Sequence, residues 1–583
     1  MNNESKINIK LSFYCLLVLI IISSCGKKNE VAPAHSNLPF IHWKAGDDII
    51  VTEDLYIDSV NFIIEPGVKV KIRSGCNIII GKNYSVKLMA IGTGDNPINF
   101  TTYNPEGLPD KSYWGSIIIN NLYNEPAIPT FEYCNFIKGG GQGSEAVIIN
   151  QSNNINFSNC LIDYSLNYGI LAKNNAGFNE FTGNTIKHTL NHPVSITSGK
   201  AHTIGINNII IADSTNQGIF LSTSNLNIGY DSIIWRAQTV PYIIPNDFSV
   251  TGSTVVSSFF IIEGGTTIML GENSNFYVGD RLKFIAIGYI EKPITFTSLQ
   301  KEPQPGDWSD IRFNHEANAV FKYCIFEYGG EYEDHMVDNA MIRLYSTTNI
   351  SMDNCLFRYS ESIAVLLYKY GANLSIPSFS SFTNNTFENL NTYAISLQSE
   401  SVNSIDYTNN FNNHEIYIQE STISSGHTIW KNLGSAYILD SYVTINGEFE
   451  TILEIEKGTK VKFDRGGIKI GTASSYGGKL IAVGTEEEPI IFTSAKENPD
   501  YGDWGGILFY KYSRPGNILN HCEILYAGEY SLNFNQASVH ISGNDTNVSV
   551  MNSTIAHSSH YGLIVSGSAN PYLFNNTFFD NLE

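Results

Sequence analysis

The acidic loop at residues 327–339, EYGGEYEDHMVDN, is the stretch whose residue types could do chemistry. Among its carboxylates and its one histidine, five residues stand close together in sequence: Glu327, Glu331, Glu333, Asp334 and His335. Paired carboxylates can exchange protons with a glycosidic bond during hydrolysis, and clustered carboxylate oxygens can hold calcium. These five residues are therefore our catalytic candidates, with calcium as the cofactor that they would suit. The alternative is a charged surface loop that only contacts water.

Two other segments of the chain align with this loop but carry fewer charges. Residues 138–146 read KGGGQGSEA, and residues 526–534 read YAGEYSLNF, each with a single carboxylate. A site in the acidic loop would therefore belong to the middle segment alone.

Two pairs of histidines have a spacing that invites a metal-site interpretation. His188 and His192 are four residues apart, and His557 and His560 flank two serines. Side chains four residues apart share one face only on a helix, whereas KHTLNHPV, which contains the first pair, is typical of a strand or loop. We therefore expect no metal site at either pair.

Three long internal repeats position these residues. One segment recurs as IEPGVKVKI, IEGGTTIML and IEKGTKVKF, at 64–72, 262–270 and 455–463. Another recurs as YWGSIII, DWSDIRF and DWGGILF, at 113–119, 307–313 and 503–509. Each repeat is therefore about 195 residues long, and the last is truncated. Because Trp114, Trp308 and Trp504 occupy the same place in every repeat, we expect them to pack rather than to stack on a sugar.

A shorter motif recurs within each repeat at intervals of 23 to 31 residues. It has an apolar residue, two variable residues, then Cys, Asn or Ser, one variable residue and a second apolar residue, as in FTNNTF at 382–387. One such unit suits one coil of a β-solenoid, which buries its apolar face by stacking on neighbouring coils. An array of β-sandwich domains, the alternative, does not explain a polar residue that returns in every unit.

The central polar position of this motif is expected to form a structural ladder along the coils. Its members are Cys134, Cys160, Asn184, Cys324, Cys355, Asn385, Cys522, Ser553 and Asn576. Successive coils lie about 4.8 Å apart, so stacked asparagines can exchange amide hydrogen bonds. Asparagine also suits the left-handed backbone of a tight bend. A position that accepts Cys, Ser and Asn favours small polar residues, so we expect its cysteines to stay reduced.

The succession IEPGV, AIGT, PI-FT and WGGI resembles that of the right-handed parallel β-helix proteins, the pectin-lyase-like superfamily in the broad sense. The resemblance covers nearly all of residues 41–583 and implies an all-β fold, a right-handed parallel β-helix. We expect modules at 41–229, 230–427 and 428–583, stacked into one continuous solenoid. The superfamily includes lyases, hydrolases, adhesins and proteins of unknown role, so the resemblance implies no particular activity.

The residues that enzymes of this superfamily use are largely missing from the sequence. Polygalacturonase-like hydrolases carry Asn-Thr-Asp, a paired Asp, Gly-His-Gly and Arg-Ile-Lys on neighbouring coils, whereas this chain has only Asp47-Asp48, near the start. Pectate-lyase-like enzymes use clustered acidic calcium ligands and an arginine base, but this chain has eight scattered arginines and no arginine-rich coil. We therefore expect no polyuronate lyase activity, and a binding protein rather than an enzyme.

The N-terminus is predicted to be a lipoprotein signal. Lys6 and Lys10 precede an apolar run, and residues 22–25 read ISSC, which resembles the bacterial lipobox. The resemblance implies a signal peptide at 1–24, acylation of Cys25 and a flexible tether at 25–40. The chain is similar to an envelope lipoprotein of Bacteroidetes type, lipid-anchored to the outer membrane on a face that the sequence leaves open.

The net charge of −21 argues against partners that need a basic surface. An acidic surface repels nucleic acid and polyanionic glycans. Our first expectation is a cell-envelope scaffold, attached to the membrane through its lipid, that binds or adheres to a glycan or an envelope protein without catalysis. The alternatives are a polysaccharide lyase or glycoside hydrolase, and a structural spacer. Converging carboxylates would favour the hydrolase, exposed aromatic residues a binding role, and a uniformly polar flank the spacer.

Overall fold

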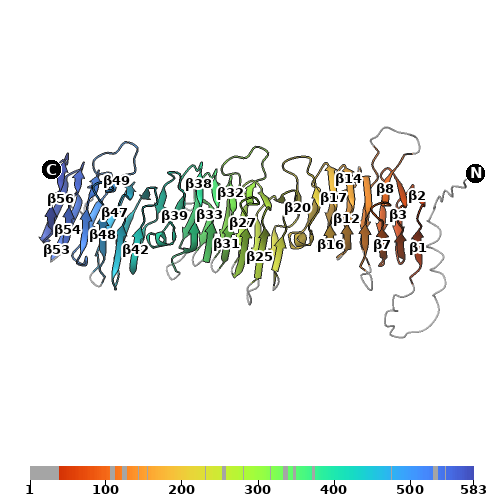
Figure 1. The fold of residues 1–583 in the computed structure, drawn as a ribbon, viewed down its shortest axis with the longest axis horizontal. Helices are drawn as coiled ribbons and strands as arrows, with labels where there is room; N and C mark the ends of the chain where they lie inside the picture. The colour runs from red at the N-terminus through yellow and green to blue at the C-terminus, as the bar shows by residue number, and fades with distance from the viewer. Residues whose placement is uncertain are drawn as a thin grey trace, which may run out of the picture. The chain divides into compact units, whose positions relative to one another are not determined.

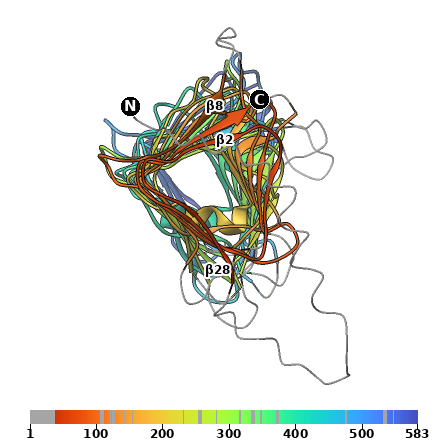
Figure 2. The ribbon, with the colours of Figure 1, turned by 90° about the vertical axis from the view of Figure 1, so that its right-hand side faces the viewer.

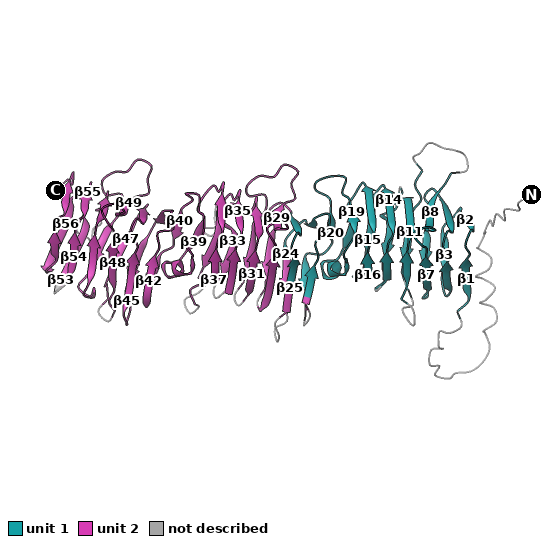
Figure 3. Cartoon of the chain, in the orientation of Figure 1, with its two compact units in different colours: residues 1–228, 233–248, 261–270 teal, residues 229–232, 249–260, 271–583 magenta. Residues whose placement is uncertain are grey.

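The computed structural model describes residues 38–104, 112–120, 122, 128–141, 143–153, 155–229, 232–252, 258–279, 281–314, 317–332, 339–345, 349–369, 375–473, 476–529, 536–544 and 547–582. The chain forms two compact units (Figure 3). The first unit comprises residues 1–228, 233–248 and 261–270, and the second comprises 229–232, 249–260 and 271–583. Within the described residues, no helix is both long and apolar enough to cross a bilayer.

Alternation of apolar and polar residues explains why the chain forms strands. In β5 (Lys69–Arg73), Val70 and Ile72 are fully buried, whereas Lys69 and Arg73 are exposed. A period of two residues places one face of a strand against the core and the other toward solvent. Each strand then pairs in parallel with strands of the preceding and following coils, as β5 does with β2 and β8. Figure 1 shows these strands side by side within each unit.

The first unit contains three rows of parallel strands, each with its strands in spatial order. The first row is β1 (Phe40–Trp43), β4 (Asn61–Ile64), β7 (Lys87–Ile91), β10 (Thr130–Glu132), β13 (Ile155–Ser158) and β16 (Phe178–Thr182). The second is β2 (Asp48–Val51), β5, β8 (Ile98–Tyr103), β11 (Cys134–Gly139), β14 (Leu161–Ser165), β17 (Thr185–Thr189) and β19 (Ile209–Ile210). The third is β3 (Leu55–Ile57), β6 (Ile78–Ile80), β9 (Ile117–Ile119), β12 (Ala146–Asn150), β15 (Tyr168–Ala172), β18 (Val194–Ile196), β20 (Ile219–Leu221), β23 (Tyr242–Ile244) and β26 (Thr267–Leu270).

Within the described residues, two short 3₁₀ helices and four further strands accompany these rows. The helices are η2 (Ser198–Thr203) in the first unit and η3 (Ser399–Ser404) in the second. The strands are β21 (Asn225–Asn227), β22 (Ser232–Trp235), β24 (Phe248–Thr251) and β25 (Ser258–Glu263). The division between the units passes through β22, β24 and β25.

The second unit contains five rows of parallel strands. The longest is β27 (Asn275–Val278), β30 (Asp310–Phe313), β33 (Ala340–Tyr345), β36 (Ile363–Tyr368), β39 (Ile395–Leu397), β40 (Ile416–Ile418), β43 (Tyr437–Leu439), β46 (Lys460–Phe463), β49 (Ile490–Ser494), β52 (Cys522–Leu525), β55 (Thr554–Ala556) and β58 (Thr577–Phe579). A second row is β28 (Leu282–Ile287), β31 (Asn318–Lys322), β34 (Asn349–Asp353) and β37 (Ser378–Thr383). A third row is β29 (Ile294–Ser298), β32 (Cys324–Glu327), β35 (Leu356–Arg358) and β38 (Thr386–Glu388). The fourth row is β41 (Ser421–Ile423), β44 (Tyr442–Ile445), β47 (Gly467–Ile470), β50 (Gly506–Phe509), β53 (Ala537–Asn544) and β56 (Tyr561–Ser568). The fifth row is β42 (Gly426–Trp430), β45 (Thr451–Ile455), β48 (Lys479–Val483), β51 (Asn517–Asn520), β54 (Val548–Met551) and β57 (Tyr572–Phe574).

The core of the second unit shows the stacking of coils most directly. Five phenylalanines from successive coils form one column: Phe296, Phe326, Phe357, Phe387 and Phe411. Neighbouring ring centroids are 5.1, 5.2, 5.0 and 5.2 Å apart, and the rings are nearly parallel. This is close to the spacing of paired strands. In Figure 2 the strands of each unit surround an interior that such side chains fill.

Bends with a left-handed backbone separate the strands of each coil. The residue before every member of the predicted ladder has a positive φ, from 48° at Tyr133 to 67° at Gly183. The residue four positions after each member is also left-handed, for example His188 and Asn389. Asn384 thus occupies the bend itself, with a φ of 54°, while Asn385 begins the next segment. The arrangement is all-β and consistent with the predicted right-handed parallel β-helix, whereas the number of repeats and their continuity stay predictions.

The repeated tryptophans are core residues, which confirms their predicted packing role. Trp114, Trp308 and Trp504 are 0% exposed. Each indole N–H donates a hydrogen bond to a backbone carbonyl oxygen, those of Ile137, Glu327 and Leu525, at 2.8, 2.9 and 2.8 Å. A buried ring with its only donor satisfied is stable in the core, and it has no face available to a sugar.

Candidate functional site

Glu327, the first of the predicted catalytic candidates, is held in an ion pair. It ends β32 and is 8% exposed. Its Oε2 lies 2.6 Å from Nη2 of Arg358, and its Oε1 accepts a hydrogen bond of 2.8 Å from Thr297. Because both oxygens are engaged by protein groups, the carboxylate is poorly placed to exchange a proton with a substrate.

Two further carboxylates at the acidic loop are bonded to protein groups. Ser309 donates a hydrogen bond to Oε2 of Glu331. Glu361, which the sequence analysis did not single out, accepts one from the backbone N–H of Tyr332 at 3.1 Å. The remaining candidates, Glu333, Asp334 and His335, lie outside the described residues. The described carboxylates bond to hydroxyl, guanidinium and backbone groups, as structural carboxylates do.

The histidine pairs have separate partners. Nδ1 of His188 is 2.7 Å from Oδ1 of Asp163, whereas Nδ1 of His192 accepts a hydrogen bond of 3.2 Å from the backbone N–H of Gly218. His557 is bonded to Asp580 at 2.8 Å. Over the described ranges, no group of three His, Cys, Asp or Glu side chains is arranged to hold a metal ion.

The predicted ladder is made mainly of bonds between side chain and backbone. Oδ1 of Asn184 accepts the backbone N–H of Cys160 at 3.0 Å, and its Nδ2 donates to the carbonyl oxygen of Phe157 at 2.8 Å. Asn385 repeats the pattern with Cys355 and Met352, at 2.9 and 2.8 Å. Each amide therefore spans the bend of the preceding coil and satisfies two backbone groups there.

In the third repeat the same ladder contains a hydroxyl. Oγ of Ser553 accepts the backbone N–H of Cys522 at 3.1 Å, and Oδ1 of Asn576 accepts that of Ser553 at 3.1 Å. Amide-to-amide bonding, which we predicted, occurs in the 3.2 Å bond from Asn184 to Asn208. Asn208 and the corresponding Asn409, which also accepts a backbone N–H, extend the ladder by one coil beyond the predicted members.

The ladder cysteines are buried thiols. Cys134, Cys160, Cys324, Cys355 and Cys522 are all free, with burial that leaves at most 2% of each exposed. Burial raises the pKa of Cys134 and of Cys324 well above the usual range of a thiol, and it raises the pKa of Cys522 to about 12. A buried thiol that stays protonated is unreactive, which suits a packing role.

Exposed or partly exposed aromatic rings stack at the second bend of the coils. Three pairs occur, one in each repeat: Tyr164 with His188, Tyr328 with Tyr359, and Tyr526 with His557. Their centroids are 4.6, 5.0 and 4.7 Å apart, and the rings are within about 13° of parallel. Because these pairs recur in all repeats and cover each other's faces, we assign them to packing at the bend.

An arginine cluster on the outer face of the second unit is the feature that the sequence analysis missed. We use this name for Asp310 and Arg312 of β30 and Arg343 of β33. Arg312 and Arg343 are register partners on neighbouring strands. Oδ2 of Asp310 lies 2.7 Å from Nη2 of Arg312 and 2.8 Å from Nε of Arg343. Two guanidinium groups therefore share one carboxylate, which is 0% exposed.

Aromatic rings flank the accessible member of the cluster. The guanidinium carbon of Arg312 is 5.2 Å from the ring centroid of Tyr277 and 5.7 Å from that of Tyr345. Its side chain is 24% exposed, against 4% for Arg343. Burial opposes the charge of Arg312, but the attraction of Asp310 outweighs it and raises the pKa of the guanidinium. Arg312 is thus a fixed cation that solvent can reach.

The sequence held a signal for this cluster. In DIRF, Asp310 and Arg312 are two residues apart, so a strand places both on one face. Arg343 lies 31 residues after Arg312, in MIRL. The arginines are therefore not all scattered, as the sequence analysis stated: two of the eight meet on adjacent coils.

Comparison with known proteins finds a similarity for part of the second unit. The model of the pectate-lyase like β-helix domain matches residues 421–513. These residues run from β41 past β50, and their strands pair in parallel as such a domain requires. The matched segment is therefore similar to a pectate-lyase-like β-helix domain. No curated protein matches the chain.

Proposed function

We propose that this chain is a lipid-anchored cell-envelope protein whose β-helix binds a glycan bearing isolated acidic groups, without cleaving it. The observation that carries the proposal is Arg312, a partly exposed guanidinium between Tyr277 and Tyr345. A planar cation beside aromatic rings recognises a carboxylate or sulfate through hydrogen bonds while the rings cover the sugar. The bonds to Asp310 use Nε and Nη2, so such a group would meet Nη1.

The surroundings of Arg312 favour binding over bond cleavage. Hydrolysis of a glycosidic bond requires two carboxyl groups facing the scissile bond, roughly 5–10 Å apart. Asp310 is fully buried between two arginines, and Glu327 is paired with Arg358. A densely charged polyuronate is also disfavoured, because the chain carries a net charge of −21. A glycan with sparse acidic groups meets the local cation without that repulsion.

Binding to an array of acidic and neutral glycans, combined with an assay for new reducing ends, tests this proposal. We expect the chain to retain acidic glycans and to release no reducing ends. Arg312→Leu should weaken that binding about 10- to 100-fold, the effect of one lost hydrogen bond to a charged group. Leucine is a suitable replacement because Leu508 holds the corresponding place in the third repeat.

The matched control is Arg465→Leu. Arg465 belongs to the same unit, but its side chain is 71% exposed and lies 3.9 Å from Asp464, so its loss changes the net charge without changing the cluster. Equal weakening in both variants would show that net charge, and not the cluster, governs binding. Release of reducing ends by the wild-type chain would replace binding with catalysis as the function.

The anchor is a separate part of the proposal. Cys25 and the tether up to residue 37 lie outside the described residues. The proposal of a lipid anchor therefore rests on the lipobox sequence alone. We expect the wild-type chain to fractionate with membranes and to incorporate labelled palmitate, and Cys25→Ala to do neither. A Cys25→Ala variant that keeps both properties would refute acylation at this residue.

A further inference from the structure

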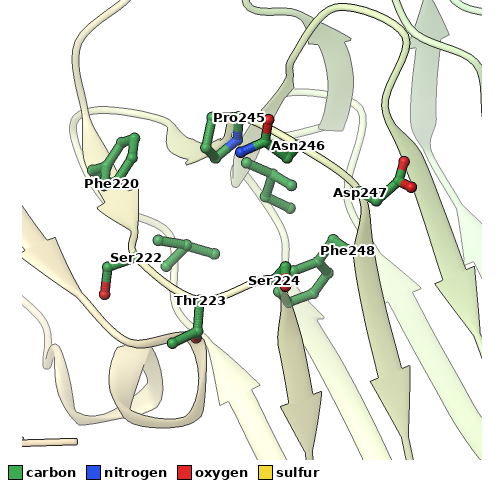
Figure 4. A pocket seen from close by; sticks show the side chains of 10 residues that line it. Phe220, Ser222, Thr223, Ser224, Pro245, Asn246, Asp247 and Phe248 are labelled. Carbon is green, nitrogen blue, oxygen red and sulfur yellow. The ribbon is translucent and has the colours of Figure 1, made fainter. Parts of the chain in front are cut away.

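A cavity of about 230 Å³ opens between two neighbouring loops of the first unit. One loop, Ser222–Ser224, follows β20, and the other, Pro245–Asp247, follows β23. The two strands are register partners, with Ile219 paired to Tyr242, so the loops leave adjacent coils at the same level. Figure 4 shows Phe220 at one side of the cavity and Asp247 at the other.

The cavity has one aromatic wall and an apolar floor. Phe220 is partly exposed, and its ring packs against that of His192 at a centroid distance of 4.9 Å. Ile244 and Phe248 are each 1% exposed, so they form a floor that belongs to the core. Pro245 lines the cavity beside them and restricts the backbone of its loop. The apolar surface is therefore a fixed part of the fold.

Polar side chains line the rest of the cavity. Ser222 and Ser224 come from one loop, and Asn246 and Asp247 from the other; all four are exposed. Thr223 is fixed by η2, because its Oγ1 accepts the backbone N–H of Ser198 at 3.0 Å. Asp247 is the only charged residue among the ten that line the cavity. Hydroxyl, amide and carboxylate groups thus surround a single ring face.

We infer that this cavity is a binding site for one pyranose ring of a neutral glycan. A pyranose has an apolar face of C–H groups, which suits Phe220 and Ile244, and a rim of hydroxyls, which suits the serines, Asn246 and Asp247. The cavity is smaller than the range of roughly 300–1,000 Å³ typical of sites for larger ligands, so it has room for one ring. An anionic sugar is disfavoured because the one charged lining residue is a carboxylate.

The site is preorganised, which raises the affinity of a small ligand. The bond from Ser198 fixes one loop, Pro245 stiffens the other, and His192 supports the aromatic wall. A ligand that enters such a site does not have to order the loops that bind it. The cavity lies in the first unit and Arg312 in the second, so this site is additional to the proposed function.

Saturation-transfer NMR of the full chain with methyl glycosides of neutral hexoses tests the inference. We expect transfer to the C–H groups of at least one pyranoside. Phe220→Ala should weaken binding about tenfold or more by removing the aromatic wall. Ser224→Trp should do the same by filling the cavity while leaving Phe220 in place. Ser224 is exposed, so this second variant tests the site even where Phe220→Ala unfolds.

The matched control is Tyr417→Ala. Tyr417 is the middle residue of β40, as Phe220 is of β20, but it stacks on Tyr393 at 5.1 Å and lies outside the cavity. Binding within about twofold of wild type in Tyr417→Ala and in Arg312→Leu supports the inference and separates it from the acidic-glycan site. Absence of transfer in the wild-type chain, or wild-type binding by Ser224→Trp, would overturn it.

Discussion

The second and third repeats differ on the outer face of one strand pair, although the coils beneath are alike. In the second repeat, β30 and β33 present the arginine cluster at this face. In the third repeat, β50 and β53 have uncharged or weakly basic residues at the corresponding positions: Gly506, Leu508 and His540. The inner-facing residues stay apolar in both, with Ile311 and Phe313 against Ile507 and Phe509, all at most 1% exposed.

The first repeat sharpens this comparison. Its corresponding residues are Ser116, Ile118 and Ile149, so two of the three repeats carry no carboxylate or arginine at this place. The coil does not need the charged cluster in order to form. Packing fixes the inner face of each strand, whereas the outer face can vary, and a charged cluster found in one repeat indicates a role beyond packing.

The largest effect is expected from removing the shared carboxylate. Asp310→Asn leaves Arg343, whose side chain is 4% exposed, and Arg312 without the carboxylate that they share. Breaking a buried charge pair from one side costs about 3–5 kcal/mol, so the free energy of unfolding should fall by that amount in urea titrations.

A triple variant provides the control. Asp310→Ser, Arg312→Ile and Arg343→Ile together install the residues of the first repeat and remove all three charges of the cluster. Replacing a whole buried ion group by packed residues is often neutral or stabilising. We expect the triple variant to be more stable than Asp310→Asn. If the triple variant is as unstable as Asp310→Asn, the side chains of the cluster stabilise the coil through packing. The difference between the repeats would then no longer indicate a role beyond packing.

The fold was predictable from the sequence because its signals are local. Alternating residues specify strands, and asparagines at several bends, such as Asn384, tolerate the left-handed backbone found there. The cluster was harder to predict, because Arg312 and Arg343 meet only if the register of their coils is known. The motif recurs at intervals that vary between 23 and 31 residues, so spacing alone does not give that register. The partner of Glu327 was also hidden from the sequence: Glu327 has the residue type of a catalytic acid, but in the fold it forms an ion pair with Arg358, 31 residues further along the chain.

Equivalent asparagines of the ladder differ in exposure between the second and third repeats. Asn385 of the second repeat is 0% exposed, whereas Asn576 of the third is partly exposed and lies between two exposed strands, β57 and β58. Asn385→Ala leaves the buried N–H of Cys355 and carbonyl of Met352 without their amide partner, which should cost about 2–3 kcal/mol. Asn576→Ala should cost about 1 kcal/mol, because water can reach the groups it exposes. Chemical denaturation measures the loss of unfolding free energy in each variant, and equal losses would contradict the predicted difference.

A smaller effect is expected where Gly329 corresponds to Ala527. Each follows the tyrosine of its bend, in YGGE and YAGE. A Cβ on Gly329 would lie 2.5 Å from Cζ2 of Trp308, so Gly329→Ala should cost roughly 1–3 kcal/mol through overpacking. Ala527→Gly creates no clash and should cost about 0.5–1 kcal/mol through the freedom of the unfolded chain. Melting temperatures that fall equally in both variants would show that the two tryptophan sites are packed alike.

The smallest effect concerns His540, which stands where the second repeat has Arg343. Burial lowers the pKa of His540 below its usual value of 6.5, and its Nε2 is bonded to Oγ of Ser566 at 3.0 Å. Because burial disfavours protonation of His540 in the folded state, the unfolded state binds more protons below about pH 6.5. The free energy of unfolding therefore decreases as the pH falls from about 6.5 to the lowered pKa of His540. His540→Leu should therefore reduce the loss of unfolding free energy between about pH 7.5 and about pH 5.

Leu508→Val on the neighbouring strand is the control, since it alters packing without a titrating group and should shift stability equally at both pH values. A pH dependence that is the same in His540→Leu as in wild type would mean that other groups account for it.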